Sequence, residues 1–216
     1  MSFELFRDRR DAGRRLAERL LDYQDRDAVV LAIPRGGVPV GFEVAGRLRA
    51  EFDVIVPRKI PIPWNPEAGM GAITADGTMV LNESMVRSLG LSKEEIEHAA
   101  EEVREEVVRR TEIYRAGRVE PEIAGKPVIL VDDGLASGYT MLAAIESLKK
   151  QGPSSIVVAV PTASSGAARL IGPKVDELVA LIVSERLPFA VADFYLEWRD
   201  LSDEEVLEFL QSPHPS

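Results

Sequence analysis

Apolar and polar positions alternate in blocks along the chain. Short runs rich in valine and isoleucine are apolar throughout, as is typical of parallel strands buried on both faces. Amphipathic stretches with apolar residues at helical spacing lie between these runs. The expected strands are residues 28–33, 52–56, 128–131, 155–160 and 178–183, and the expected helices are 6–23, 38–50, 140–151 and 163–171. This repeated order predicts an α/β fold with a mostly parallel sheet flanked by helices and right-handed crossovers.

Residues 92–118 depart from this alternation and are expected to form one long inserted helix. Ser92 and Glu95 have the spacing of a capping box. Acidic residues fill the first half and basic residues the second, an order that suits the helix macrodipole. Two interpretations stay open: a solvated helix that packs on the domain by its apolar stripe, or a dimer surface or lid. The apolar stripe consists of Ile96, Ala100, Val103, Val107 and Tyr114.

Length and composition limit the possible classes of protein. The 216 residues fit a single domain spanning 1–216. The chain has no cysteine, which excludes disulfides, thiolate metal sites and a cysteine nucleophile. A net charge of −10 is unsuited to nucleic-acid binding. With no signal-peptide pattern at the N-terminus and no apolar run of membrane-spanning length, we expect a cytoplasmic protein that binds neither nucleic acid nor membrane.

Residues 128–140 contain the strongest candidates for a ligand-binding site. Its apolar strand ends in Asp132 and Asp133, a turn of small residues follows, and a helix begins near Thr140. Ligands of open α/β sheets bind beyond the carboxyl ends of the strands, where a turn of small residues and a helix start expose N–H groups to a phosphate. Ser137 can add a hydroxyl donor, and Gly138 lets a phosphate approach closely. The paired carboxylates suit vicinal sugar hydroxyls, although they could also simply cap a strand-to-helix turn.

This segment resembles the phosphoribosyl-diphosphate motif of the type I phosphoribosyltransferases. The resemblance implies that family's Rossmann-like fold, here with a long inserted helix and a small C-terminal hood. It also implies that Asp132 and Asp133 hold the ribose hydroxyls and carry catalysis together with Lys59. The residues expected to bind the ribose phosphate as a whole are Asp132, Asp133, Gly134, Ala136, Ser137, Gly138, Tyr139 and Thr140, of which the last five would surround the 5′-phosphate.

Two further segments resemble the same family. Arg35, Gly36 and Gly37 follow the first strand and resemble its diphosphate loop, in which a cis non-proline peptide is expected at 35–36. Arg58 and Lys59 end the second strand and resemble the basic residues that meet the diphosphate. Taken alone, these are also compatible with a plain turn and with two surface cations. Residues 60–77 occupy the family's mobile-loop position, and we interpret them as a lid that excludes water.

The acceptor side resembles the purine members of the family less closely. Phe189, Asp193 and Arg199 match residues that stack on the base, face its exocyclic group and approach the diphosphate, at a shorter spacing. Ala136 stands where those members carry a third acid. Phe189 also fits simple core packing.

The implied reaction transfers the 5-phosphoribosyl group from phosphoribosyl diphosphate to a nitrogen acceptor such as a nucleobase, with Mg²⁺ at the diphosphate and a homodimer as the expected assembly. A non-catalytic sensor of phosphoribosyl diphosphate is the alternative. A hydrolase is disfavoured, because His98 and His214 both lie in solvent-facing contexts and no Gly-x-Ser-x-Gly turn occurs. A Walker-type ATPase is disfavoured because Gly125-Lys126 precedes a strand and lacks the rest of the motif.

Overall fold

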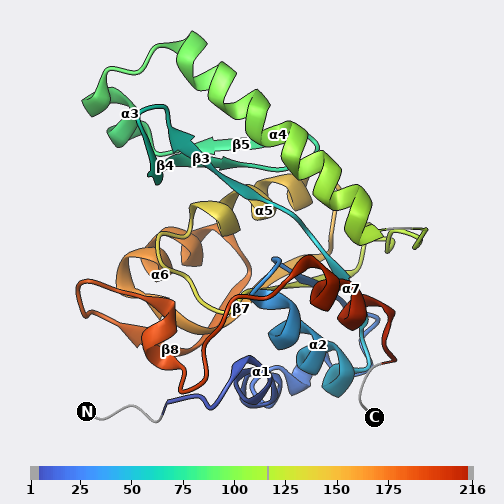
Figure 1. The fold of residues 1–216 in the computed structure, drawn as a ribbon. Helices are drawn as coiled ribbons and strands as arrows, with labels where there is room; N and C mark the ends of the chain where they lie inside the picture. The colour runs from blue at the N-terminus through green and yellow to red at the C-terminus, as the bar shows by residue number, and fades with distance from the viewer. Residues whose placement is uncertain (1–4, 116, 214–216) are drawn as a thin grey trace.

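Five parallel strands form the central sheet of a computed structural model that describes residues 5–115 and 117–213 (Figure 1). The order across the sheet is β2-β1-β6-β7-β8, with every neighbouring pair parallel. All five strands coincide with expected ones, because unbroken runs of β-branched residues can be buried on both faces. The strands are β1 (Val29–Ala32), β2 (Glu51–Val54), β6 (Pro127–Val131), β7 (Ser155–Ser164) and β8 (Glu177–Ser184).

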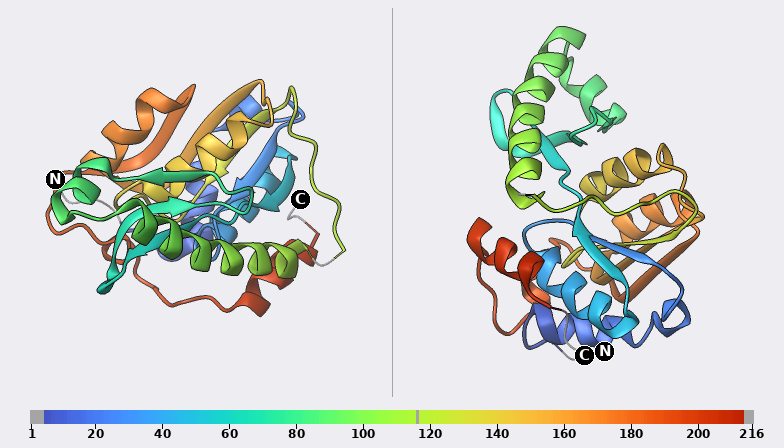
Figure 2. Two further views of the ribbon diagram at one scale, coloured as in Figure 1. Left: turned by 90° about the horizontal axis from the view of Figure 1, so that it is seen from above. Right: turned by 90° about the vertical axis from the view of Figure 1, so that its right-hand side faces the viewer.

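Helices cover both faces of this sheet (Figures 1 and 2). On one face lie α1 (Arg9–Ala17), α2 (Gly37–Leu48) and α7 (Asp203–Gln211), and on the other α5 (Tyr139–Lys149) and α6 (Ser165–Ile171). Short 3₁₀ turns, η1 (Leu21–Tyr23), η2 (Gly172–Lys174) and η3 (Val191–Phe194), complete the connections. The expected α/β architecture is confirmed.

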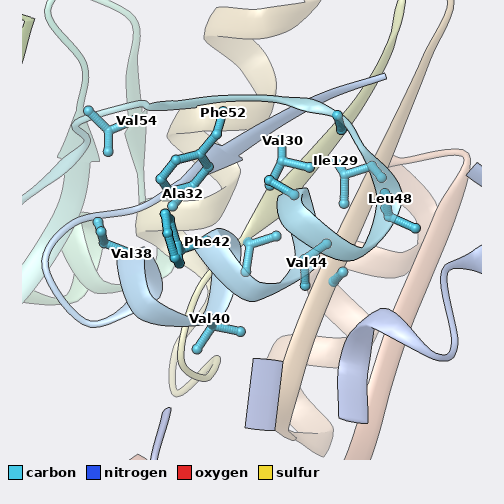
Figure 3. Packing of buried hydrophobic residues seen from close by; sticks show 14 of the residues in the cluster. Val30, Ala32, Val38, Val40, Phe42, Val44, Leu48, Phe52, Val54 and Ile129 are labelled. Atoms are coloured by element: carbon cyan, nitrogen blue, oxygen red, sulfur yellow. The ribbon is translucent and has the colours of Figure 1, made fainter. Parts of the chain in front are cut away.

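Successive residues of each central strand pack into different apolar clusters, one on each face of the sheet. Val30 and Ile129 pack toward α2, as Figure 3 shows for the cluster around Phe42 and Phe52. Their neighbour Val29 faces α5 and α6 instead. The two clusters hold the sheet rigid, so its carboxyl edge is a fixed platform for the turns that leave it.

A second, antiparallel sheet interrupts the alternation after β2. It consists of β3 (Arg58–Ile62), β4 (Asn65–Ile73) and β5 (Met79–Leu81), in the order β3-β4-β5. With α3 (Glu83–Leu89) and the first half of α4 (Lys93–Arg115) it encloses its own apolar cluster, which includes the fully buried Ile60 and Met70. We call residues 58–100 the cap; it packs over α5 (Figure 1). Residues 60–77, expected to be a mobile loop, thus largely form the hairpin of β3 and β4, in which Ile60, Ile62 and Met70 are buried. A lid movement of this segment stays a prediction.

The long helix α4 confirms the expected stripe and cap. Ser92 and Glu95 exchange both capping-box hydrogen bonds, at 2.9 and 3.2 Å. Ile96 and Ala100 are buried in the cap cluster, whereas Val107 and Tyr114 are buried in the core beneath α2 and α7. The helix therefore joins two apolar clusters, which is the packed interpretation of its stripe.

Several boundaries differ from the sequence-based expectations. The first helix covers only 9–17 of the expected 6–23, because Asp8 caps it and Phe6 pairs with Tyr195 instead. Residues 163 and 164 belong to β7, so α6 begins at Ser165. Helices α3 and α7 were not expected. In the part of the chain that the structure describes, no helix combines the length and the apolar character required to span a bilayer.

Candidate functional site

Asp132 and Asp133 leave the carboxyl end of β6 and lie side by side in a part-buried position. The backbone N–H of Asp133 donates to Asp132 Oδ1 at 2.8 Å. Asp133 Oδ2 accepts from Arg9 Nε at 2.8 Å, and the Asp133 carbonyl accepts from the Tyr195 hydroxyl at 2.7 Å. These bonds fix both side chains. Asp132 Oδ2 and Asp133 Oδ1 take no part in them.

The two carboxylates perturb one another. Burial and the adjacent Asp133 carboxylate raise the pKa of Asp132 well above its ordinary value of 3.8. Burial also raises the pKa of Asp133, although the Arg9 guanidinium opposes the increase. Hydroxyl donors or cations that approach these carboxylates would stabilise their charged form. The site is therefore suited to binding groups of this kind.

The turn after the aspartates exposes backbone donors at the start of α5. Leu135 is pinned to β7 by bonds to Thr162 and from Ser164, at 2.9 and 2.8 Å. Gly138 takes a φ of +83° directly before the helix, a conformation that favours glycine. Among the residues that the structure describes, the N–H groups of Ser137 and Gly138 have no acceptor in the chain. Together with the first free N–H groups of α5, they form an anion-binding turn.

The turn after β1 packs directly against the aspartates. A Cβ on Gly36 would lie 1.9 Å from Asp133 Oδ2, and one on Gly37 would lie 2.8 Å from Asp132 Cα. These glycines are thus required by close contact between the two turns. A cis non-proline peptide is present in this turn, but between Pro34 and Arg35, one residue before the expected position.

The arginines expected at the diphosphate already have carboxylate partners. Arg35 Nη1 lies 3.6 Å from Asp203 Oδ1 at the start of α7, and Arg58 Nη1 lies 2.5 Å from Glu106 Oε1 of α4. Lys59 lies next to Arg58 on β3 and is exposed. The structure therefore links both arginines to helices that the sequence did not associate with the site.

Arg9 is a site residue that the sequence analysis missed. Its side chain is about nine-tenths buried, with Nε on Asp133, Nη1 on the Arg199 carbonyl at 2.7 Å and the guanidinium 3.9 Å from the Trp198 ring centre. Residue 6 pairs with residue 195, and this pairing brings α1 to the site. Nothing local marks Arg9, because four other arginines lie within residues 7–15.

The residues expected to contact the acceptor lie on the same C-terminal segment. A cavity of about 200 Å³ is lined by Phe189 and Asp193. Phe189 is half-buried, with its ring centre 5.3 Å from that of Phe194. The Val191 side chain packs where a Cβ of Gly134 would lie, so this segment closes over the aspartate turn. The exposed Arg199 guanidinium pairs with Glu205 of α7.

The two histidines of the chain were not expected to be catalytic. His98 is exposed on α4, and His214 lies outside the described residues. Among the described residues, no group of three or more His, Cys, Asp or Glu side chains could hold a metal ion.

The parallel sheet, with its two turns meeting at the carboxyl edge, defines the type I phosphoribosyltransferase fold. The profile of the phosphoribosyl transferase domain matches residues 5–197. A Mycobacterium tuberculosis H37Rv protein is 40% identical over 98% of this chain. It is named as a phosphoribosyl transferase whose activity is not established. This chain spans 47% of that protein's length, or about half.

Solved structures agree with this assignment. The protein TT1426 from Thermus thermophilus is 40% identical, with a TM-score of 0.80 over 96% of this chain and 98% of its own. A hypoxanthine phosphoribosyltransferase from Staphylococcus aureus shares the fold at 12% identity, with a TM-score of 0.51 over 92% of this chain and 85% of its own. The chain belongs to the phosphoribosyl transferase domain family.

Proposed function

We propose that this domain transfers the 5-phosphoribosyl group from phosphoribosyl diphosphate to a nitrogen acceptor. The supporting observation is the contact between two turns: Asp132 and Asp133 lie against Gly36 and Gly37, and the free N–H groups of the α5 turn follow at once. One side of such a site suits a sugar with vicinal hydroxyls and a terminal phosphate, and the other suits a second anion.

In this reaction the acceptor nitrogen forms a bond to the anomeric carbon while the bond from that carbon to diphosphate breaks. The acceptor loses a proton, and diphosphate leaves with the bonding electrons. The open carboxylate oxygens, Asp132 Oδ2 and Asp133 Oδ1, would accept from the ribose hydroxyls. They would also stabilise the positive charge that develops on the ribose ring, as carboxylates do in glycoside cleavage. The turn at 136–140 would hold the 5′-phosphate, with Arg35, Arg58 and Lys59 at the diphosphate.

Mg²⁺ fits this site as a companion of the substrate. The ion is commonly held by one or two carboxylates together with phosphate oxygens, and the adjacent Asp132 and Asp133 supply that number. Bound there, it would neutralise charge on the leaving group. A nucleobase acceptor would lie against Phe189, with Asp193 near its polar edge.

The test is diphosphate release from phosphoribosyl diphosphate and Mg²⁺ with a panel of nucleobases. Asp132→Asn keeps the Oδ1 atom that accepts from Asp133 N–H but removes the charge. It should reduce release by about 10²–10³-fold while the protein stays folded. Glu102→Gln, an exposed change on α4, should leave the rate unchanged. Equal rates for Asp132→Asn and the unaltered protein would exclude this role for the aspartates.

A sensor of phosphoribosyl diphosphate is the second candidate, and one observation favours it. Arg35 and Arg58 are paired with Asp203 of α7 and Glu106 of α4, so a diphosphate at these arginines would release both helices. A sensor would show a melting temperature that rises with phosphoribosyl diphosphate concentration, but no diphosphate release with any acceptor. A transferase shows both.

A further inference from the structure

Strand β8 forms one edge of the central sheet, and its outer side has no neighbouring strand (Figure 1). All residue pairings of Glu177–Ser184 are with β7. In the part of the chain that the structure describes, no hydrogen bond from any other segment reaches the main chain of this strand. The outer side of β8 therefore presents a row of free N–H and C=O groups, which is a template for pairing with another strand.

The other strand edges carry features that oppose such pairing. The edge strand β2 begins with the charged Glu51, and Arg118 Nη2 donates to its Phe52 carbonyl at 2.8 Å. In the second sheet, β3 contains Pro61 and β5 has three residues. By contrast, β8 has eight residues, and those at 178–183 are all apolar, without proline or glycine. Natural proteins usually protect edge strands with charges, proline or covering segments, so the unprotected β8 indicates an interface.

The partner that fits this edge is a second copy of the same strand. A two-fold axis through Ala180, perpendicular to the sheet, sets two copies antiparallel, with Glu177 of one opposite Val183 of the other. Along 177–183 no two like charges then face each other, which favours association of chains that each carry a net charge of −10. An axis through Leu181 gives the same overlap but brings Glu177 opposite Glu185. Charge therefore selects the register centred on Ala180.

Exposed apolar side chains lie where this edge ends. Val183 is 47% exposed, and Leu187, three residues beyond the strand, is 90% exposed. Ser184, the last residue of β8, and Leu187 also line the cavity of about 200 Å³ that contains Phe189. A second copy paired on β8 would therefore lie next to the cavity assigned above to the acceptor.

We propose that the chain forms a two-fold dimer in which the β8 strands of two copies pair antiparallel about Ala180. This pairing joins the two central sheets into one continuous sheet. Main-chain hydrogen bonds supply the affinity, as in other cases of strand addition. Because each copy contributes little more than one strand, the interface is small, and we expect the dimer to exchange with monomer at micromolar concentrations. The proposal is independent of the transfer reaction, since no residue assigned to that reaction lies on β8.

Cross-linking tests the axis, because the chain has no cysteine of its own. In Ala180→Cys the two introduced thiols would face each other. Directly opposed Cβ atoms of antiparallel strands lie about 4.5–5.5 Å apart, near the span of a disulfide, so oxidation should give a covalent dimer. Ser88→Cys, at an exposed position on α3, is the control and should stay monomeric under the same conditions. Sedimentation of the unaltered protein should show a dimer whose fraction rises with concentration, and a monomer at every concentration would overturn the proposal.

Two substitutions at the exposed Val183 test the register by the sign of a charge. Val183→Glu would face the partner's Glu177 twice in each dimer, and it should weaken dimerisation about tenfold. Val183→Lys would face the same carboxylate and should dimerise at least as well as the unaltered protein. Thermal melting checks that both variants fold. Equal dissociation constants for the two variants, or a dimer in which Ala180→Cys does not cross-link, would contradict the assignment.

Discussion

Arg9 fixes the position of Asp133 from the opposite end of the sequence. It is held by three contacts at once, with Asp133, the Arg199 carbonyl and the Trp198 ring. A guanidinium with so many partners has little freedom, so it orients the carboxylate that it touches. Arg9 is thus a positioning residue for the proposed site.

Replacing Arg9 should damage both stability and ligand binding. Arg9→Gln leaves Asp133 buried without its ion pair, and loss of one partner of a buried pair costs about 3–5 kcal/mol. Arg9→Lys keeps the charge and should recover part of the affinity for phosphoribosyl diphosphate. Chemical denaturation and calorimetric titration measure the two effects. Arg7→Gln, at an exposed pair with Asp8, is the control and should leave both the stability and the affinity unchanged.

Unlike replacement of Arg9, replacement of Asp132 should increase stability while it reduces function. Its folded pKa is raised by burial and by Asp133, so at neutral pH the charged carboxylate destabilises the fold. Asp132→Asn should therefore raise the melting temperature, by about 2–4 °C for each kcal/mol recovered in a domain of this size. The gain should disappear as pH falls through the raised pKa toward the ordinary value of 3.8, because the unaltered side chain is then protonated in the folded protein. A variant less stable than the parent at neutral pH would contradict this account.

At the scale of elements, α4 and α7 meet the proposed anion site through one charged network. Glu106 pairs with Arg58 and with Arg110, the latter at 3.5 Å. Burial alone would raise the pKa of Asp203, but the Tyr114 hydroxyl, Arg110 and Arg35 together hold it below its usual value. Two carboxylates thus occupy the arginines that a diphosphate would contact.

Removing one of these carboxylates should strengthen anion binding. Glu106→Gln frees Arg58, and because a half-exposed pair is worth up to about 1 kcal/mol, the affinity for inorganic diphosphate should rise by up to about fivefold. Glu102→Gln, one turn earlier on the same helix, is the matched control. Titration calorimetry separates them, and a weaker affinity in Glu106→Gln would show that the pair supports the site instead of competing for it.

The glycine turn before α2 gives an equally direct test. In Gly37→Ala the new methyl group would meet the backbone of Val131 and Asp132 at 2.8 Å, which cannot be relieved by a side-chain rotation. We expect a loss of about 1–3 kcal/mol and of phosphoribosyl diphosphate binding. Gly166→Ala in α6 meets no atom closer than 3.8 Å, so it should be neutral or stabilising by up to about 1 kcal/mol. Equal stability of the two variants would argue against close contact between the turns.

Over the whole molecule, sequence patterns predicted the strands, helices and turns whose structure depends on residues close together in the chain. The five parallel strands and the α5 turn follow from uninterrupted apolar runs and from a glycine-containing turn before a helix. The position of Arg9 could not be predicted, because it depends on pairing between residues 6 and 195. The hairpin at 60–73 was hidden because its prolines and glycines also fit a loop, and only burial against α4 decides between them.

The cap is expected to open more easily than the sheet on which it rests. Its cluster around Ile60 and Met70 is distinct from the two clusters that pack on the central sheet. Its attachments include the continuous helix α4, packing on α5, the pair between Arg58 and Glu106, and the exposed Lys150, whose Nζ lies 2.6 Å from Thr78 Oγ1. Regions with fewer buried contacts open at lower free energy than core strands.

Native-state hydrogen exchange can measure this difference directly. We expect amides of β3 to β5 to exchange through an opening of lower free energy than those of β1, β6 and β7. Opening of the cap would also break the pair between Arg58 and Glu106, so diphosphate at Arg58 should shift this equilibrium and leave the exchange of β6 unchanged. Identical opening free energies for both sheets would instead mean that the cap and the central sheet unfold as one cooperative unit. In that case an interpretation of 60–77 as a moving lid would have no support from the fold.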